Sequence, residues 1–206
     1  MFHKESDMGE IIREPKQSRS IETKKRIVEA GYELFALKGY FNTNTAEIAK
    51  HAGVSTGIVY GYFHDKRDIL LDVLDIYVAK VFQPVFDILD GLTNPVEFNE
   101  LIVKFLDYAV DVHKNNASIH EALHSLVPVD EAVRERFSEL EQSMTEHTVA
   151  SLKQCGVNVD GLTERVHITI DNIQSFAHEV VFDDHEYIDY GKMKTFVIKS
   201  LVDIFE

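Results

Sequence analysis

The stretch GYFNTNTAEIAKHAGVSTGIVYGYFHDKRDILL, from Gly39 to Leu71, decides the fold of this 206-residue chain. It predicts two short helices over 45–51 and 56–63, joined by the turn Ala52-Gly53-Val54-Ser55. A charged segment that begins a third helix follows at once. This layout is typical of a helix-turn-helix, whose second helix enters the major groove of DNA.

The turn and the second helix have residues suited to these roles. Gly53 permits the tight turn because it adopts a positive φ without a Cβ penalty, and Ser55 is a good N-cap. Val59 and Phe63 are four positions apart, so both can face the small core beneath the turn. The side chains that remain to face a phosphate backbone are Thr56, Tyr60 and Lys66.

Two blocks of sequence carry a family resemblance. The first is Thr43 … Ile48-Ala49-x-x-Ala52-Gly53-Val54-Ser55-x-Gly57-x-x-Tyr60-x-Tyr62-Phe63-x-x-Lys66, and the second is Arg26-Ile27-x-x-Ala30-x-x-x-Leu34-Phe35-x-x-x-Gly39. Together they cover about a quarter of the chain, and they resemble the N-terminal domain of TetR-type (tetracycline repressor-like) transcriptional regulators. The remainder is similar to that family only in length and helical character. Thr45 and Gly61 depart from it, because an apolar residue and a longer side chain are usual there.

The resemblance implies a ligand-responsive transcriptional regulator, a repressor that binds pseudo-palindromic, double-stranded operator DNA as a homodimer and is released by a small-molecule effector. It implies no enzymatic activity, and we expect no cofactor. Helix 45–51 begins where free backbone N–H groups favour a phosphate or a capping side chain. Tyr62 and Lys66 are expected to clamp the DNA backbone. The predicted DNA contacts are Thr43, Asn44, Thr45, Ser55, Thr56, Gly57, Ile58, Tyr60, Tyr62 and Lys66.

Charge is distributed unevenly along the chain, whose net charge is −14. The first 70 residues contain 11 Lys and Arg against 10 Asp and Glu, and the remainder contains 10 against 25. A mildly basic head is therefore followed by a strongly acidic body. The acidic residues either orient the head toward DNA or simply keep the body soluble, and the sequence leaves both interpretations open.

The chain is expected to contain an N-terminal arm and two domains. Residues 1–19 are polar and predict a flexible arm, residues 20–66 the helix-turn-helix domain, and residues 67–206 an effector-binding and dimerisation domain. No apolar run is long enough for a bilayer and no signal-peptide core is visible. The single Cys155 fits a reducing compartment. We therefore expect a cytoplasmic protein with no membrane partner.

Helical periodicity continues throughout the body, and no alternating strand pattern occurs, so the predicted fold class is all-α. The first helix is expected over 20–37, and a long helix that Asp65 can cap is expected to end near Pro84. Further helices are predicted over 95–114, 117–126, 130–154, 162–182 and 187–205, with Gly191 able to delay the start of the last by a turn.

The last two predicted helices are unusually apolar. The resemblance implies that they pair with their copies across a two-fold axis, as a four-helix dimer interface. The alternative is that they form a deep core within one chain.

The body is expected to hold the effector pocket that the resemblance implies. Apolar and aromatic residues at helical spacing are more often core than ligand contacts, so both interpretations stay open. Acidic surroundings would suit a cationic, apolar ligand. The inward-facing candidates are Phe105, Tyr108, His124, Phe137, Met144, His147 and Phe176.

Two other motifs point toward enzymes. Gly53-Val54-Ser55-Thr56-Gly57 matches the G-x-S-x-G elbow of hydrolases, but that elbow follows a strand and a helix is predicted here. His120-Glu121-Ala122-Leu123-His124 matches H-E-x-x-H, so a metal-dependent hydrolase using His120, Glu121 and His124 is the alternative function. A regulatory metal or ligand site, with His113 nearby, is another alternative. Ordinary helix-face histidines are the favoured interpretation, with no metal site.

Overall fold

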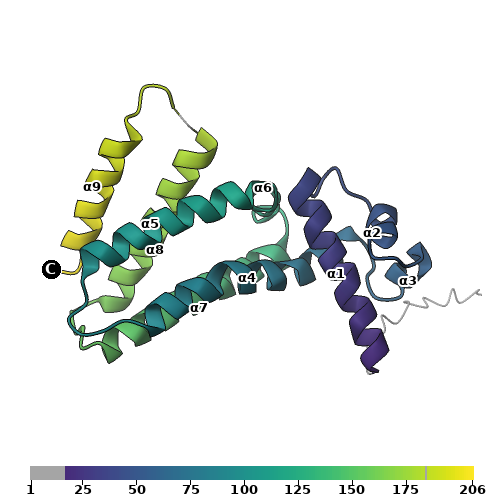
Figure 1. Cartoon of the computed structure of the whole chain (residues 1–206), viewed down its shortest axis with the longest axis horizontal. Coiled ribbons are helices and arrows are strands. Elements are labelled where there is room, and N and C mark those ends of the chain that lie inside the picture. Colours follow the sequence, from purple (N-terminus) through teal and green to yellow (C-terminus); the bar gives the residue numbers. More distant parts are fainter. Residues whose placement is uncertain (1–16, 184) are drawn as a thin grey trace, which may run out of the picture. The chain divides into compact units, whose positions relative to one another are not determined.

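The computed structural model describes residues 17–183 and 185–206 (Figure 1). All regular elements of these residues are helical, which confirms the all-α prediction. The chain divides into two compact units, with the division between Ile76 and Tyr77. Residues 1–16 of the expected arm lie outside the described residues, while Ser18 and Arg19 already belong to the first helix.

The first unit consists of α1 (Ser18–Lys38), α2 (Thr45–His51), α3 (Thr56–Tyr60) and the first part of α4 (Lys66–Asp90). Gly31 allows α1 and α4 to approach closely, since a Cβ there would lie 2.8 Å from Cγ2 of Ile69. The fully buried side chains of this unit are Ile27, Phe35, Ile48, Val59, Ile69, Leu70, Val73 and Leu74.

Two helix boundaries differ from the expected ones. α3 ends at Tyr60 rather than at residue 63, and Gly61 forms its C-cap. The prediction that α4 ends near Pro84 is wrong, because the helix continues to Asp90 with Pro84 inside it. A proline in a helix removes the single hydrogen bond of its own missing N–H, and the turns on both sides of Pro84 are retained.

The second unit contains the rest of α4 and helices close to their predicted ranges. These are α5 (Phe98–Asn115), α6 (Ala117–Leu126), α7 (Glu131–Gln154), α8 (Leu162–His178) and α9 (Tyr190–Asp203). α8 is extended by the π-helical turn η1 (Glu179–Asp183). α9 starts a turn later than residue 187, where the Asp189 side chain caps the Lys192 N–H.

α5, α8 and α9 pack together in this unit (Figure 1). Much of the apolar surface expected at a dimer interface is therefore buried within the chain. Phe196 on α9 is nevertheless 71% exposed, and Ile168 on α8 is 49% exposed. The buried cluster comprises Ile102, Leu106, Ala109, Ile173, Phe176, Ala177 and Leu201.

Among the described residues, no helix is both long and apolar enough to cross a bilayer.

Candidate functional site

The turn between α2 and α3 has the predicted geometry. Gly53 adopts φ +67°, a conformation that favours glycine. Ser55 caps α3, its Oγ accepting a hydrogen bond from the Ile58 N–H at 3.4 Å. Val59 is fully buried and Phe63 is 2% exposed, so both face inward as expected.

The opposite side of α3 is open to solvent. Ile58 is 44% exposed and Tyr60 is 50% exposed, whereas Val59 between them is fully buried. Ser55 and Gly57 are also exposed, and Thr56 is half-buried. This five-residue helix therefore presents a hydroxyl-bearing and apolar face that nothing in its own unit covers.

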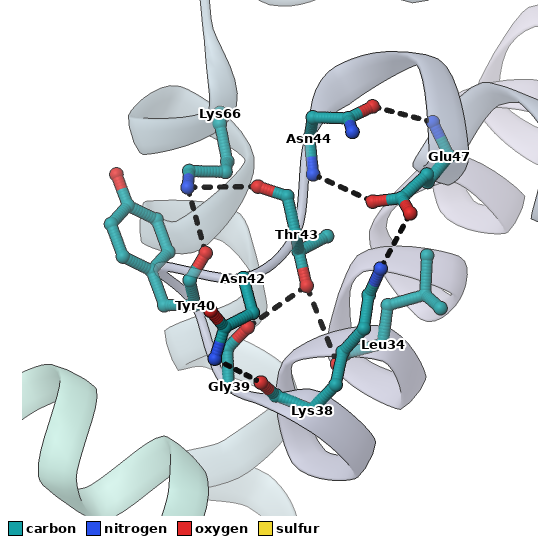
Figure 2. Close-up of polar contacts among 9 residues, drawn as sticks. All are labelled: Leu34, Lys38, Gly39, Tyr40, Asn42, Thr43, Asn44, Glu47 and Lys66. Carbon is teal, nitrogen blue, oxygen red and sulfur yellow. Dashed lines mark hydrogen bonds and ion pairs between the residues drawn. The ribbon is translucent and has the colours of Figure 1, made fainter.

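The start of α2 is closed by a capping box (Figure 2). Asn44 Oδ1 accepts from the Glu47 N–H at 3.0 Å, and Glu47 Oε2 accepts from the Asn44 N–H at 3.1 Å. Lys38 Nζ lies 2.7 Å from the Glu47 carboxylate. Lys38 and the Asn44 N–H hold the pKa of Glu47 below its usual value. Asn44 is thus the cap, and Thr45 behind it is half-buried.

The predicted phosphate contact by Thr43 does not fit its position. Its side chain is 3% exposed, and Oγ1 donates to the Gly39 carbonyl at 2.9 Å (Figure 2). The Thr43 N–H donates to the Tyr40 carbonyl at 3.2 Å. These polar groups are committed to the turn between α1 and α2, so they are not available to DNA in this conformation.

Lys66 is also placed differently from its predicted role as a backbone clamp. Its Nζ donates to the carbonyl oxygens of Tyr40 at 2.7 Å and Thr43 at 2.9 Å (Figure 2). The ammonium also lies 4.1 Å from the centre of the Tyr40 ring. Burial lowers the pKa of Lys66. The residue supports the turn from inside, because it donates to two of the carbonyl groups of that turn.

Two further residues of the first unit, Tyr62 and Lys50, bear on the proposed DNA-binding surface. Tyr62 is half-buried, and its hydroxyl lies 2.7 Å from Ser20 Oγ near the start of α1. Lys50 in α2, absent from the predicted contacts, is exposed, and its ammonium has no partner among the described residues. The signal that could have identified it is its place directly after the buried pair Ile48-Ala49.

The second unit contains a cavity of about 660 Å³ bounded by α4, α5, α6, α7 and α8. Its lining is mainly apolar and aromatic. Tyr108 donates to the Val81 carbonyl at 2.7 Å, and burial raises the pKa of its phenol. Five of the seven predicted pocket residues line this cavity: Phe105, Tyr108, His124, Phe137 and Met144.

The other two predicted pocket residues, Phe176 and His147, are not among the described residues that line this cavity. Phe176 is 4% exposed and packs in the core between α5, α8 and α9. His147 faces away from the lining: its Nε2 lies 2.8 Å from Asp90 Oδ1, and its ring stacks on Phe86. Both follow helical periodicity correctly, but periodicity does not distinguish a core-facing position from a cavity-facing one.

One end of the cavity is lined by His113, His120, His124 and His178. The ring centres of His113 and His120 are 4.2 Å apart, and those of His120 and His124 are 4.1 Å apart. Burial is the main cause that lowers the pKa values of His113 and His124, and it lowers that of His120 to about 3. At neutral pH His120 is therefore a neutral imidazole. His178, from α8, was not predicted to join this group.

The geometry does not support the two enzyme motifs. Glu121 is exposed and is not among the described residues that line the cavity, so it does not accompany the histidines as a general base would. Ser55 follows helix α2 and the turn rather than a strand.

Comparison with known proteins shows what these features are similar to. Residues 27–73 match the model of bacterial regulatory proteins of the tetR family. The chain is 38% identical over 91 residues to the HTH-type transcriptional regulator HbdR of Aromatoleum sp. (strain CIB), covering 42% of this chain and 37% of that protein. It is 32% identical over 131 residues to the uncharacterized HTH-type regulator YuxN of Bacillus subtilis, covering 64% and 45%. The alignments thus span less than half the length of both relatives.

The fold of most of the chain has solved counterparts. One is the transcriptional regulator FadR from Bacillus subtilis in complex with stearoyl-CoA, with TM-score 0.61 and 19% identity over 86% of this chain and 97% of that one. At this identity the likeness concerns the fold. The match to the tetR-family model covers α2, the turn and α3, so this part of the chain is similar to bacterial regulatory proteins of that family.

Proposed function

We propose that this protein is a DNA-binding transcriptional regulator, a repressor that binds a two-fold symmetric operator as a homodimer in the cytoplasm. A small molecule that enters the cavity of the second unit releases it from DNA. The proposal includes no enzymatic activity.

The exposed face of α3 is the observation that carries this proposal. A helix of a small core normally turns its large apolar residues inward, yet Ile58 and Tyr60 are half exposed on either side of the buried Val59. Ile58 can contact a thymine methyl group, and the Tyr60 hydroxyl can reach a base edge or a phosphate. Gly57 leaves room for the backbone to approach the groove closely.

The residues that we propose to contact DNA phosphates differ from those predicted from the sequence. Because Thr43 and Lys66 are committed to carbonyl groups of the turn, the exposed Lys50 is the better cation for the DNA backbone. Each phosphate contact adds to the salt dependence of binding but carries no sequence information.

The cavity supports a small-molecule effector. A volume of about 660 Å³ falls within the usual range for ligand sites, which are mostly apolar with a few polar groups. The TetR-type fold of FadR accommodates stearoyl-CoA, so an effector with a large apolar part is the class we propose. Glu141 and Asp171 also line the cavity, so a cationic group on the ligand would be suited to it.

Release from DNA requires that the effector bind one conformation of the dimer better than the other. The coupling between the two sites cannot exceed this difference in affinity. α4 contributes residues to both units, and we propose it as the element through which the cavity affects α3.

The dimer is proposed to form through α8 and α9. Phe196 is 71% exposed and Ile168 is 49% exposed, which supports a surface that a second copy covers. Phe196→Glu should shift the protein toward monomer in sedimentation velocity, whereas Thr195→Glu, at an exposed neighbouring position, should not. A dimer unaffected by Phe196→Glu would place the interface elsewhere.

Operator binding is tested by fluorescence anisotropy with duplexes from the DNA flanking the gene for this protein, at several salt concentrations. We expect tight, sequence-selective binding that Tyr60→Ala reduces by one to two orders of magnitude, the loss of about 1–3 kcal/mol typical of one base contact. Lys50→Ala should weaken binding to all duplexes alike and reduce the salt slope by about one. Equal affinity for all duplexes in the wild type, unchanged in Tyr60→Ala, would contradict the proposal for these DNA sites.

A further inference from the structure

The histidines at one end of the cavity form a polar group that DNA binding does not use and that an apolar effector does not require. His120 and His124 are one helical turn apart on α6, and His178 ends α8. One ring nitrogen from each residue lies within 4.8 Å of those from the other two. We propose that His120, His124 and His178 bind a divalent first-row transition-metal ion such as Zn²⁺.

The distances are close to those that coordination requires. A tetrahedral zinc site with Zn–N bonds of about 2.0–2.1 Å places its nitrogens roughly 3.3 Å apart. The trio must therefore contract by no more than about 1.5 Å. His124 is exposed and His178 is half-buried, so rotation of these two side chains can close the site around the ion while His120 stays fixed.

His120 gives a second, independent reason to expect an occupant. Its side chain is 7% exposed, and its Nε2 has no hydrogen-bond partner among the described residues. A buried polar atom without a partner is rare and usually indicates a bound water or ion. Because His120 belongs to the group of three imidazoles, a shared metal ion would satisfy its unpartnered ring.

The surroundings of His178 also fit a metal ligand. Asp183, in the π-helical turn after α8, has a carboxylate oxygen 3.6 Å from His178 Nδ1. Second-shell carboxylates commonly orient metal-bound histidines from this side of the ring, which leaves Nε2 for the ion. Phe182 in the same turn stacks on His120, with ring centres 5.2 Å apart, and restricts its orientation.

The type of ion follows from the ligands. Three imidazoles favour zinc, nickel, cobalt or copper, whereas magnesium and calcium prefer oxygen donors. Three protein ligands leave at least one coordination position for water or another donor. All three histidines line the cavity, so a molecule inside it can approach that position. This site does not depend on the proposed function, because it can bind metal whether or not the head binds DNA.

The test uses the full chain without a purification tag, stripped with a chelator and titrated with Zn²⁺ in a calorimeter at pH 7.5. We expect one ion per chain and no comparable binding of Mg²⁺. His124→Gln and His178→Gln should each weaken binding by more than the roughly 10–100-fold that second-shell changes cause. Thermal unfolding should show that these variants are folded and that Zn²⁺ raises the midpoint only of the wild type.

His167→Gln is the matched control, since this histidine also lies on α8 but is exposed and near Asp171, 3.5 Å away. It should leave zinc binding unchanged. Co²⁺ provides a second readout, because the intensity of its visible absorption reports the coordination number. The proposal is overturned by the absence of stoichiometric binding, by wild-type affinity in both His124→Gln and His178→Gln, or by an equal loss in His167→Gln.

Discussion

The helix-turn-helix unit and the cavity unit satisfy their polar groups in opposite ways. In the first, Lys66, Thr43 and Asn44 are each bonded to backbone or capping groups of the turn that they support, and the uncommitted surface lies outside, on α3. In the second, His120 Nε2, which has no hydrogen-bond partner among the described residues, is buried at the end of a cavity. This difference supports the proposal that the first unit meets its ligand at its surface and the second in its interior.

Adjacent substitutions on α3 give the strongest test of this contrast. Val59→Asp places an unpaired carboxylate at a fully buried position and should cost the first unit about 3–5 kcal/mol, enough to unfold it. Ile58→Asp changes the exposed neighbour and should leave the melting curve nearly unchanged while abolishing operator binding. Differential scanning calorimetry with anisotropy distinguishes the two outcomes. Similar destabilisation by both would mean that α3 has no free face.

In the second unit, Phe176 and Phe137 test the contrast between a position in the core and a position that lines the cavity. Phe176→Ala removes a ring from the core and should cost about 3–5 kcal/mol in urea unfolding. Phe137→Ala should cost only about 1 kcal/mol, because the half-buried Phe137 borders an existing cavity and loses fewer contacts. An equal loss would show that Phe137 belongs to the core and that the cavity is smaller than described.

Lys66 tests whether a cation in the first unit acts on its own fold or on DNA. Lys66→Ala removes two hydrogen bonds to carbonyl oxygens and should destabilise the protein by about 1–2 kcal/mol, given its partial exposure. Lys50→Ala, at an exposed position, should stay within about 0.5 kcal/mol. If Lys66→Ala instead kept full stability and lowered the salt slope by about one, Lys66 would be the phosphate clamp that the sequence suggested.

The smallest expected effect concerns the capping box. Asn44→Ala should destabilise the first unit by about 1 kcal/mol, and Asn44→Gly by only a few tenths. Chemical denaturation of the two variants measures the difference. Equal stability of the two would indicate that the Asn44 side chain is not the cap of α2.

The sequence predicted most of the helix-turn-helix because its determinants are local. Gly53, Ser55 and Val59 lie within seven consecutive residues, so their spacing alone specifies their roles. The contacts of Lys66 could not be predicted in this way, because its partners, the Tyr40 and Thr43 carbonyls, lie more than twenty positions earlier. The sequence does not indicate whether the ammonium of a lysine after a helix-turn-helix faces the carbonyl groups of its own fold or the DNA.

The cavity was predictable only in part, because its lining also depends on contacts between residues that are distant in the sequence. Periodicity identified Phe105, Tyr108 and Met144 as inward-facing, but the same criterion also selected Phe176, which lies in the core. The H-E-x-x-H match drew attention to α6, yet it pointed to Glu121 rather than to His178. His178 joins the pair through the packing of α8, a tertiary contact that no spacing within the sequence encodes.

The most direct test of the central claim is selection of binding sites from a pool of random DNA duplexes by the wild-type protein and by Tyr60→Ala. The account predicts that the wild type enriches an inverted repeat, with half-site centres roughly 34 Å or a multiple apart as expected for a dimer, and that Tyr60→Ala loses this enrichment. Failure of the folded wild-type protein to enrich any sequence, or identical enrichment by Tyr60→Ala, would contradict recognition of an operator through α3.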